Sequence, residues 1–112
     1  MKKIEAIFRH TRFEEVKSAL DAIGVRGMTV TEVKGAGKQR GYTETYRGSK
    51  VTIMLRPKLQ IMLVVDDGHV RQVVRAIIEN ATTGEIGDGK IFVSPVEEAI
   101  AIRSGHKNEE AV

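Results

Sequence analysis

The sequence predicts an α+β domain, a ferredoxin-like βαββαβ sandwich with a four-stranded antiparallel sheet and both helices on one face. Two observations support this fold class. Strand and helix patterns follow one another as strand-helix-strand, and then as strand-helix-strand again, along a chain of 112 residues. The strand pattern over 58–66 is apolar on both sides, which indicates a central strand. Helices would cover one face of that strand, so we expect neighbouring subunits to cover the other.

The first half of the chain contains a strand, a helix and a second strand. Residues 3–9 alternate, which places Ile4, Ala6 and Phe8 on one face. Thr11 and Glu14 have the spacing of a capping box, so we expect the helix to begin there. A second strand, rich in Thr and Val, is predicted over 27–33. The predicted helix stops at Gly24 and buries one apolar stripe, formed by Phe13, Val16, Leu20 and Ile23.

The second half repeats this order after the strand at 58–66. Asp67 is predicted to be the N-cap of a second helix that ends near Asn80. A short strand over 91–93 follows, and residues 94–97 repeat a helix-start signal that we expect to open one turn. Residues 99–103 alternate as a short edge strand, and 104–112 form a polar, loose tail. The stripe of the second helix consists of Val70, Val73, Val74, Ile77 and Ile78.

A long basic, glycine-rich stretch separates the two halves and contains two tyrosines, Tyr42 and Tyr46. Most loops in compact domains are short, and long ones are usually functional or disordered. We interpret 37–55 as a flexible interaction loop, whose return limb over 51–55 could pair back as a ribbon. The alternative is a solvated β-ribbon with no partner.

A second glycine-rich loop, residues 82–90, has the chemistry of a phosphate-binding loop. Gly84 to Lys90 matches the first seven places of the pattern G-x-x-x-x-G-K. Ile91 stands where Ser or Thr would hold magnesium, and a strand follows instead of a helix, so this is not a nucleotide-hydrolysing P-loop. Glycine N–H groups and the Lys90 charge still suit a phosphate. The alternative is a plain turn with a solvated lysine.

Composition and motifs exclude several classes of function. The chain has no cysteine, which rules out disulfides and thiolate metal sites. His10, His69 and His106 lack metal-ligand spacing, and no nucleophile motif occurs, so we expect no enzyme activity. A net charge of +3 suits phosphate-bearing small molecules as well as nucleic acid, but an aromatic content of 4% argues against single-strand binding. No apolar run approaches the ~20 residues that span a bilayer, so the expected location is the cytoplasm.

Taken together, these motifs resemble the PII signal-transduction family over essentially the whole chain. The 83–93 run, TGEIGDGKIFV, is the most specific match. Four further stretches match: 27–31 (GMTVT), 34–41, 46–48 (YRG) and 102–105 (IRSG).

The resemblance implies a homotrimer with nucleotide sites in the clefts between subunits. ATP and ADP would compete there, and 2-oxoglutarate would join ATP through a shared Mg²⁺ held by Gln39. Arg103 would reach the phosphates from the neighbouring subunit, while Thr29 and Val64 would contact the adenine. The implied nucleotide-binding residues are Thr29, Gly35, Gly37, Lys38, Val64, Gly87, Asp88, Gly89, Lys90 and Arg103. Those implied for 2-oxoglutarate are Arg9, Gln39, Gly41 and Lys58.

Some positions depart from the pattern that the resemblance implies. Val51 replaces a tyrosine that is often uridylylated, and Ala101 replaces an arginine that assists Arg103. Lys38 stands where arginine is usual, which keeps the charge but loses the bidentate fork. Ala36 removes an apolar wall beside 2-oxoglutarate, and Met62 replaces a glutamate near the adenine.

The function implied is that of a non-enzymatic sensor of nitrogen and energy status. Tyr46 and Arg47, on the long loop, would dock onto an ammonium transporter, which would bring the protein to the membrane surface. The alternative is a regulator of an enzyme of nitrogen metabolism, such as glutamine synthetase, nitrogenase or an amino-acid kinase; a transcriptional regulator is a further possible partner. A nucleic-acid-binding module is disfavoured because the sheet lacks paired aromatic residues.

Overall fold

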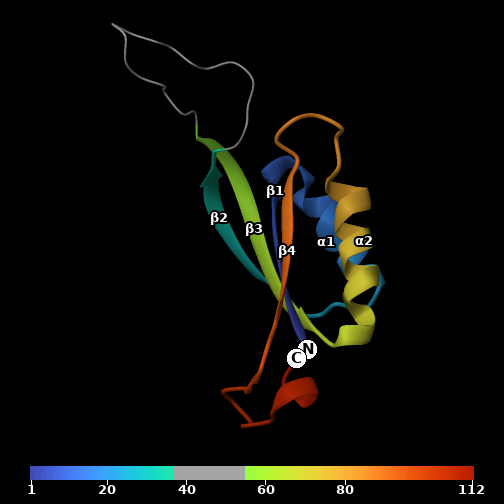
Figure 1. Cartoon of the computed structure of the whole chain (residues 1–112), viewed down its shortest axis with the longest axis vertical. Coiled ribbons are helices and arrows are strands. Elements are labelled where there is room, and N and C mark those ends of the chain that lie inside the picture. Colours follow the sequence, from blue (N-terminus) through green and yellow to red (C-terminus); the bar gives the residue numbers. More distant parts are fainter. Residues whose placement is uncertain (37–54) are drawn as a thin grey trace, which may run out of the picture.

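The computed structural model describes residues 1–36 and 55–112. The predicted interaction loop, including its return limb up to residue 54, lies outside the described residues. The described elements follow the predicted order (Figure 1). They are β1 (Lys2–Arg9), α1 (Phe13–Ala22), β2 (Thr29–Gly35), β3 (Arg56–Val65), α2 (Val70–Ala81) and β4 (Gly89–Pro95).

The four strands form one antiparallel sheet in the order β2-β3-β1-β4. Both helices lie on one face of this sheet, as Figure 1 shows. The predicted α+β class and the central position of β3 are therefore confirmed. Because β1 is the other inner strand, its last residue, Arg9, lies directly opposite Lys58 of β3.

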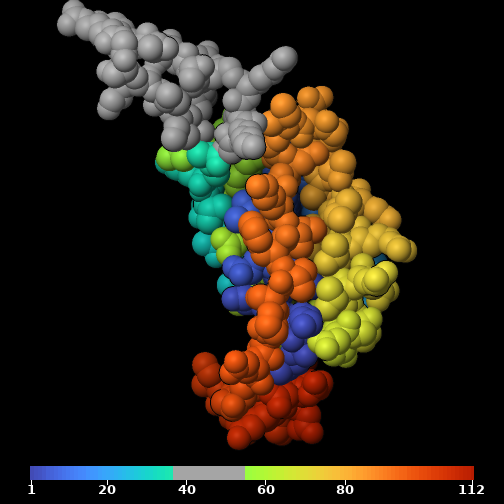
Figure 2. All heavy atoms as spheres, viewed as in Figure 1, coloured from blue at the N-terminus to red at the C-terminus, as the bar shows by residue number. Residues whose placement is uncertain are grey.

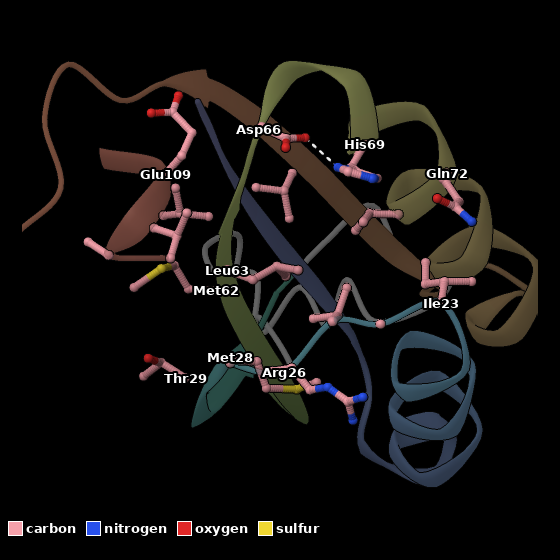
Figure 3. Close-up of a pocket in the computed structure, with 18 residues that line it drawn as sticks. Ile23, Arg26, Met28, Thr29, Met62, Leu63, Asp66, His69, Gln72 and Glu109 are labelled. Carbon is pink, nitrogen blue, oxygen red and sulfur yellow. Dashed lines mark hydrogen bonds and ion pairs between the residues drawn. The ribbon is translucent and has the colours of Figure 1, made fainter. Parts of the chain in front are cut away.

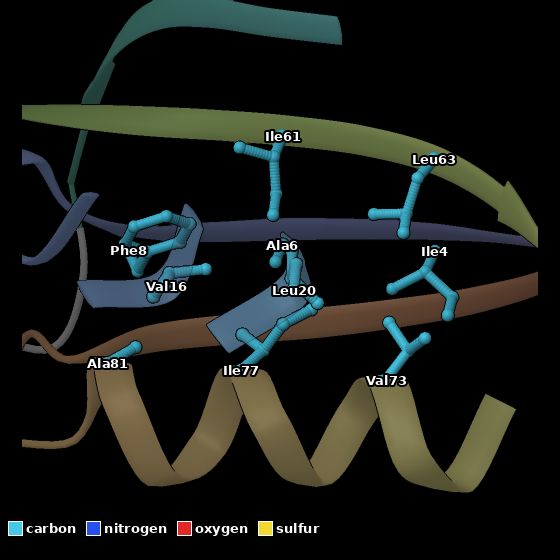
Figure 4. Close-up of a cluster of buried hydrophobic side chains, with 10 residues drawn as sticks. All are labelled: Ile4, Ala6, Phe8, Val16, Leu20, Ile61, Leu63, Val73, Ile77 and Ala81. Atoms are coloured by element: carbon cyan, nitrogen blue, oxygen red, sulfur yellow. The ribbon is translucent and has the colours of Figure 1, made fainter. Parts of the chain in front are cut away.

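The core fills the space between the sheet and the two helices (Figure 4). Ile4, Ala6 and Phe8 are buried as the alternation of β1 predicts, and Ile61 and Leu63 lie opposite Ala6 and Ile4 in β3. One member of the predicted stripes differs, because Ile78 is 52% exposed on the outer side of α2. The helices bury Val16, Leu20, Val73, Ile77 and Ala81.

The face of the sheet that carries no helix is partly apolar. Met62 lies opposite Glu5, and Glu5 also pairs with Phe92 of β4, which is 53% exposed. The carboxylate of Glu5 accepts a hydrogen bond of 3.0 Å from the side-chain amide of Gln60 on this face. The two apolar sides predicted for β3 are therefore present, and coverage of this face by other subunits stays a prediction.

The end of α1 agrees with the sequence, but the predicted N-caps are wrong. Gly24 has φ +90° and donates to the Asp21 carbonyl at 3.1 Å, while the N–H of Val25 donates to the Leu20 carbonyl at 3.0 Å. These two bonds form a Schellman motif, which explains why the helix stops there. At the helix starts, Thr11 and Asp67 lie inside short 3₁₀ turns, His10–Arg12 and Asp67–His69, and neither side chain caps the helix that follows.

The C-terminal part of the chain also differs from the prediction. No helical turn begins at 94–97, because β4 continues to Pro95, which pairs with Lys2 of β1. No edge strand forms over 99–103, where the described contact is one bridge between Ile100 and Lys107. The tail folds back instead of extending loosely: the N–H of Asn108 donates to the Ala99 carbonyl at 2.7 Å, and residues Asn108–Glu110 form a 3₁₀ turn.

Candidate functional site

In the loop between α2 and β4, the carboxylate of Asp88 is hydrogen-bonded back to residues at the start of the loop. Asp88 accepts hydrogen bonds from the backbone N–H groups of Thr83, at 2.8 Å, and Gly84, at 2.9 Å. The hydroxyl of Thr83 also donates to Asp88 and accepts from the N–H of Glu85 at 3.2 Å. A carboxylate is an acceptor only, so these donors fix its position at the centre of the loop.

Two cations from the sheet reach the same loop. The Nε of Arg9 donates to the Asp88 carboxylate at 3.1 Å, and its Nη2 donates to the Ile86 carbonyl at 2.7 Å. The Nζ of Lys58 donates to the Gly87 carbonyl. Arg9 and Lys58 are opposite each other in β1 and β3, so two positive charges lie together at one end of the sheet.

The local environment shifts the pKa of the two groups that face each other across this cluster. The Thr83 hydroxyl first, then the backbone N–H of Thr83, Arg9 and the N–H of Gly84, hold the pKa of Asp88 well below its usual range, although burial opposes them. The pKa of Lys58 is lowered mainly by burial of its side chain, and then by the charges of Arg9 and Arg56, with Asp88 opposing. Lys58 is only 7% exposed. The cluster is therefore a compact site with two cations, Arg9 and Lys58, in which the carboxylate of Asp88 is ionised and held by hydrogen-bond donors.

Asp88 should make the stability of the protein depend on pH in a defined direction. Its folded-state pKa is below that of an unfolded aspartate, about 3.9. Its stabilisation is therefore complete above that pH and is lost as the pH falls through the lower folded-state pKa. We expect the difference in free energy of unfolding between wild type and Asp88→Asn to be constant from about pH 7 to about pH 5 and to shrink below about pH 4. Urea unfolding across this range measures it, and a difference that persists unchanged in acid would contradict the assignment.

Gly89 joins the loop to β4 at a point where its backbone lies against the backbone of β1. Its φ is +111°, and a Cβ placed on it would lie 1.8 Å from the Ile7 carbonyl oxygen. Only glycine fits so close to another backbone. The next residue, Lys90, is opposite Ile7 in β1, so its side chain projects from the helix-free face beside the loop.

The predicted ligand residues that the structure brings together come from four segments. Gly87 and Asp88 of the loop are hydrogen-bonded to Lys58 and Arg9, and Gly89 and Lys90 begin β4 opposite Phe8 and Ile7 of β1. Gly35 ends β2 beside the side chain of Lys58, whose Cγ would lie 3.1 Å from a Cβ at that position. Six further predicted residues lie outside the described ones: Gly37, Lys38, Gln39, Gly41, Tyr46 and Arg47.

Other predicted residues lie at the opposite end of the sheet. Thr29 and Val64 line a cavity of about 620 Å³ together with Met62, which is the cross-strand neighbour of Thr29 (Figure 3). On the rim of this cavity, the side chains of Asp66 and His69 are hydrogen-bonded. Arg103 belongs to the segment after β4, drawn in red at the lower end of Figures 1 and 2, whereas the 82–90 loop lies at the upper end. Those predicted nucleotide-binding residues that the structure describes therefore form two separate groups within one chain.

The role of Thr83 was not predicted from the sequence. Its backbone N–H and its hydroxyl both donate hydrogen bonds to Asp88. A threonine five positions before an aspartate in a glycine-rich loop was the available signal. No three His, Cys, Asp or Glu side chains among residues 1–36 and 55–112 are grouped so that they could hold a metal. None of the helices in the described part of the chain is long and apolar enough to cross a membrane.

Fold and loop together define a ferredoxin-like domain with a cationic, glycine-rich loop at one end of its sheet, and comparison with known proteins gives its family. The family model of nitrogen regulatory protein P-II matches residues 1–106. The chain is 58% identical over 112 residues to the nitrogen regulatory protein P-II of Nostoc punctiforme and 54% identical to that of Synechocystis sp., with full coverage of both partners in each case. A crystal structure of Arabidopsis thaliana PII bound to citrate superposes with a TM-score of 0.82 at 41% identity, covering 99% of this chain and 91% of that one. This chain belongs to the nitrogen regulatory protein P-II family, a family of regulatory signal-transduction proteins.

Proposed function

We propose that this protein is a non-enzymatic sensor that binds ATP or ADP at one site and 2-oxoglutarate beside it, and that it regulates nitrogen assimilation. The observation that carries the proposal is the cationic cluster at the 82–90 loop, where Arg9 and Lys58 bond the glycine-rich loop and Lys90 follows its last glycine. Such a loop suits phosphate oxygens, because backbone N–H groups and a lysine together stabilise the negative charge.

The nucleotide would be held between subunits. Lys58 and Val64 are six residues apart on one extended strand, which separates the loop from the adenine end by roughly 20 Å. The segment after β4, to which Arg103 belongs, lies at the end of the molecule opposite the loop (Figure 1). We infer that the two ends come from neighbouring subunits of a homotrimer, in which Arg103 of one subunit reaches the phosphates bound by the loop of the next. The partly apolar, helix-free face of the sheet supports burial between subunits.

A dicarboxylate would bind at Arg9 and Lys58. These residues place two cations side by side in neighbouring strands, which suits the two carboxylates of 2-oxoglutarate. Citrate, the ligand named for the Arabidopsis relative, is also a polycarboxylate. Gln39 and Gly41 would complete this site, and Gln39 would supply an oxygen to Mg²⁺, which prefers oxygen ligands. The metal would fix the relative position of nucleotide and keto acid.

The partner would be bound by the long loop over 37–55. We propose that Tyr46 and Arg47 dock onto an ammonium transporter, so that the protein associates with the membrane through that partner. The competing proposal is an enzyme of nitrogen metabolism, such as glutamine synthetase, as the target. A pull-down from membranes with ATP, ADP and 2-oxoglutarate varied separates the two, because only the first predicts retention by transporter-containing membranes with ADP and release by Mg-ATP with 2-oxoglutarate.

Lys90→Ala should weaken the binding of both ATP and ADP. A hydrogen bond to a charged group contributes about 1.5–3 kcal/mol, which corresponds to roughly a 10- to 150-fold change in the dissociation constant. Titration calorimetry measures the affinities, and light scattering should show an unchanged oligomer because Lys90 would serve the ligand cleft more than the core. Lys17→Ala is the matched control, since Lys17 is an exposed lysine on α1 paired with Asp21. Equal affinities in wild type and Lys90→Ala would remove Lys90 from the site.

The same calorimeter tests the 2-oxoglutarate proposal. We expect heat when 2-oxoglutarate is titrated into protein with Mg-ATP, and none when ADP replaces ATP. Linkage also requires that ATP tighten 2-oxoglutarate by the same factor by which 2-oxoglutarate tightens ATP. Equal heat with both nucleotides, or none with either at millimolar keto acid, would mean that the protein senses nucleotide alone.

A further inference from the structure

The hydrogen bonds accepted by the carboxylate of Asp88 use the donors that surround it. Its two oxygens accept from the N–H groups of Thr83 and Gly84, from the Thr83 hydroxyl and from the Nε of Arg9. A phosphate brought to these oxygens would meet a like charge, and the neighbouring donors already bond the carboxylate. Asp88 is therefore poorly suited to contact a nucleotide, although it lies between two residues, Gly87 and Gly89, that are suited to do so.

Arg9 is also engaged by the loop. One guanidinium nitrogen bonds the Asp88 carboxylate and another bonds the Ile86 carbonyl, so a single side chain holds the loop at two points. Lys58 holds a third point, the Gly87 carbonyl. All three contacts run from inner strands of the sheet to a loop that belongs to the α2–β4 connection. The sheet thus fixes the loop from outside, while Asp88 fixes it from within.

We propose that Asp88 is a positioning residue of the phosphate-binding loop, and that Arg9 acts on phosphate binding through Asp88 in addition to any contact with a keto acid. This inference rests on the proposed function, because it concerns how the loop is prepared for a polyphosphate. Ordering a flexible loop costs conformational entropy, so a loop held in its binding form before the ligand arrives binds more tightly.

Thr83 provides a matched pair of variants for this proposal. Its hydroxyl donates to Asp88 and accepts from the N–H of Glu85, so both functions depend on the oxygen and not on the methyl group. Thr83→Ser keeps the hydroxyl and should retain wild-type behaviour. Thr83→Val keeps the shape, removes the hydroxyl and should loosen the loop.

Binding of inorganic triphosphate and of ATP, both without keto acid, tests the role of the carboxylate. We expect Asp88→Asn and Arg9→Ala each to weaken both ligands by about tenfold or more, with Thr83→Val intermediate and Thr83→Ser near wild type. The two large effects should be less than additive in the double variant, because each single change already removes the contact between Arg9 and Asp88. Asp21→Asn, which breaks an exposed ion pair with Lys17 on α1, is the control and should bind normally.

The direction of the Asp88→Asn effect separates the proposal from simple electrostatics. If the carboxylate merely repelled phosphate, removing its charge would tighten triphosphate binding, and that result overturns the proposal. If Arg9 served a keto acid alone, Arg9→Ala would leave triphosphate and ATP binding unchanged, which overturns its second part.

Amide hydrogen exchange in the ligand-free protein keeps the result independent of the nucleotide proposal. The amides of Thr83 and Gly84 should exchange about tenfold faster in Asp88→Asn, while those of β1 and β3 stay protected. Unchanged exchange at Thr83 and Gly84 would overturn the positioning role whatever the ligand. If the two amides exchange faster in Asp88→Asn but the wild-type protein binds neither ATP nor triphosphate, the proposed function is overturned. The claim that the ordered loop serves a phosphate is then overturned with it.

Discussion

Gly89→Ala is expected to lower the free energy of unfolding by about 4 kcal/mol or more, at the upper end of what single substitutions cost. The new Cβ would lie 1.8 Å from the Ile7 carbonyl oxygen and 2.9 Å from the Cα of Phe8, so backbone of β1 or β4 must move. Alanine would also be held at a φ of +111°, where L-residues are strained. Because β1 is an inner strand, β4 is the strand that must detach.

Urea unfolding measures this loss of free energy, with Gly68→Ala as the control variant. Gly68 lies in an exposed turn before α2, and no atom is within 4 Å of a Cβ at that position, so its replacement should cost little. A Gly89→Ala protein within about 1 kcal/mol of wild type would show that β1 and β4 are not in such close contact.

Ile77→Ala is expected to cost about 2–5 kcal/mol, whereas Ile78→Ala should change stability by no more than about 0.5 kcal/mol. The two residues are neighbours of the same type in α2, and they differ in burial: Ile77 is 1% exposed and Ile78 is 52% exposed. Ile77 points toward Leu20 in the core, where its removal leaves a cavity (Figure 4).

The pair is measured by thermal or urea unfolding of both variants under one condition. A large loss in Ile78→Ala would mean that the outer side of α2 is covered in the assembled protein. A small loss in Ile77→Ala would mean that the core collapses around the missing atoms. Either result would contradict the burial on which the comparison depends.

Much of the fold could be predicted because its signals are periodic. The alternation around Ile4, Ala6 and Phe8 correctly gave the buried face of β1, and Gly24 correctly marked the end of α1. Local start signals failed where pairing between strands decided the structure. Residues 94–97 read as a helix start, yet pairing with β1 extends β4 to Pro95, which is tolerated at the end of an edge strand.

The candidate site was less accessible from the sequence. The glycines and Lys90 were visible as a local pattern. The contact of Arg9 with Asp88 was not, because these residues are 79 positions apart and no short-range rule links them. Burial of Lys58 was equally hidden, since it follows from the packing of loop and sheet around a side chain that looks solvated in the sequence.

The order of the strands has a consequence for folding. The two inner strands of the sheet are β1 and β3, and β3 begins more than fifty positions after the start of β1. The strand β4 follows only after α2. Long-range pairing of this kind requires costly loop closures and is slow. The 82–90 loop depends on Arg9 and Lys58 from strands made earlier, so it can take its final form only after β4 has joined β1. During synthesis, the proposed ligand site is therefore expected to be among the last parts of the molecule to form, and a chain interrupted before β4 would lack this site.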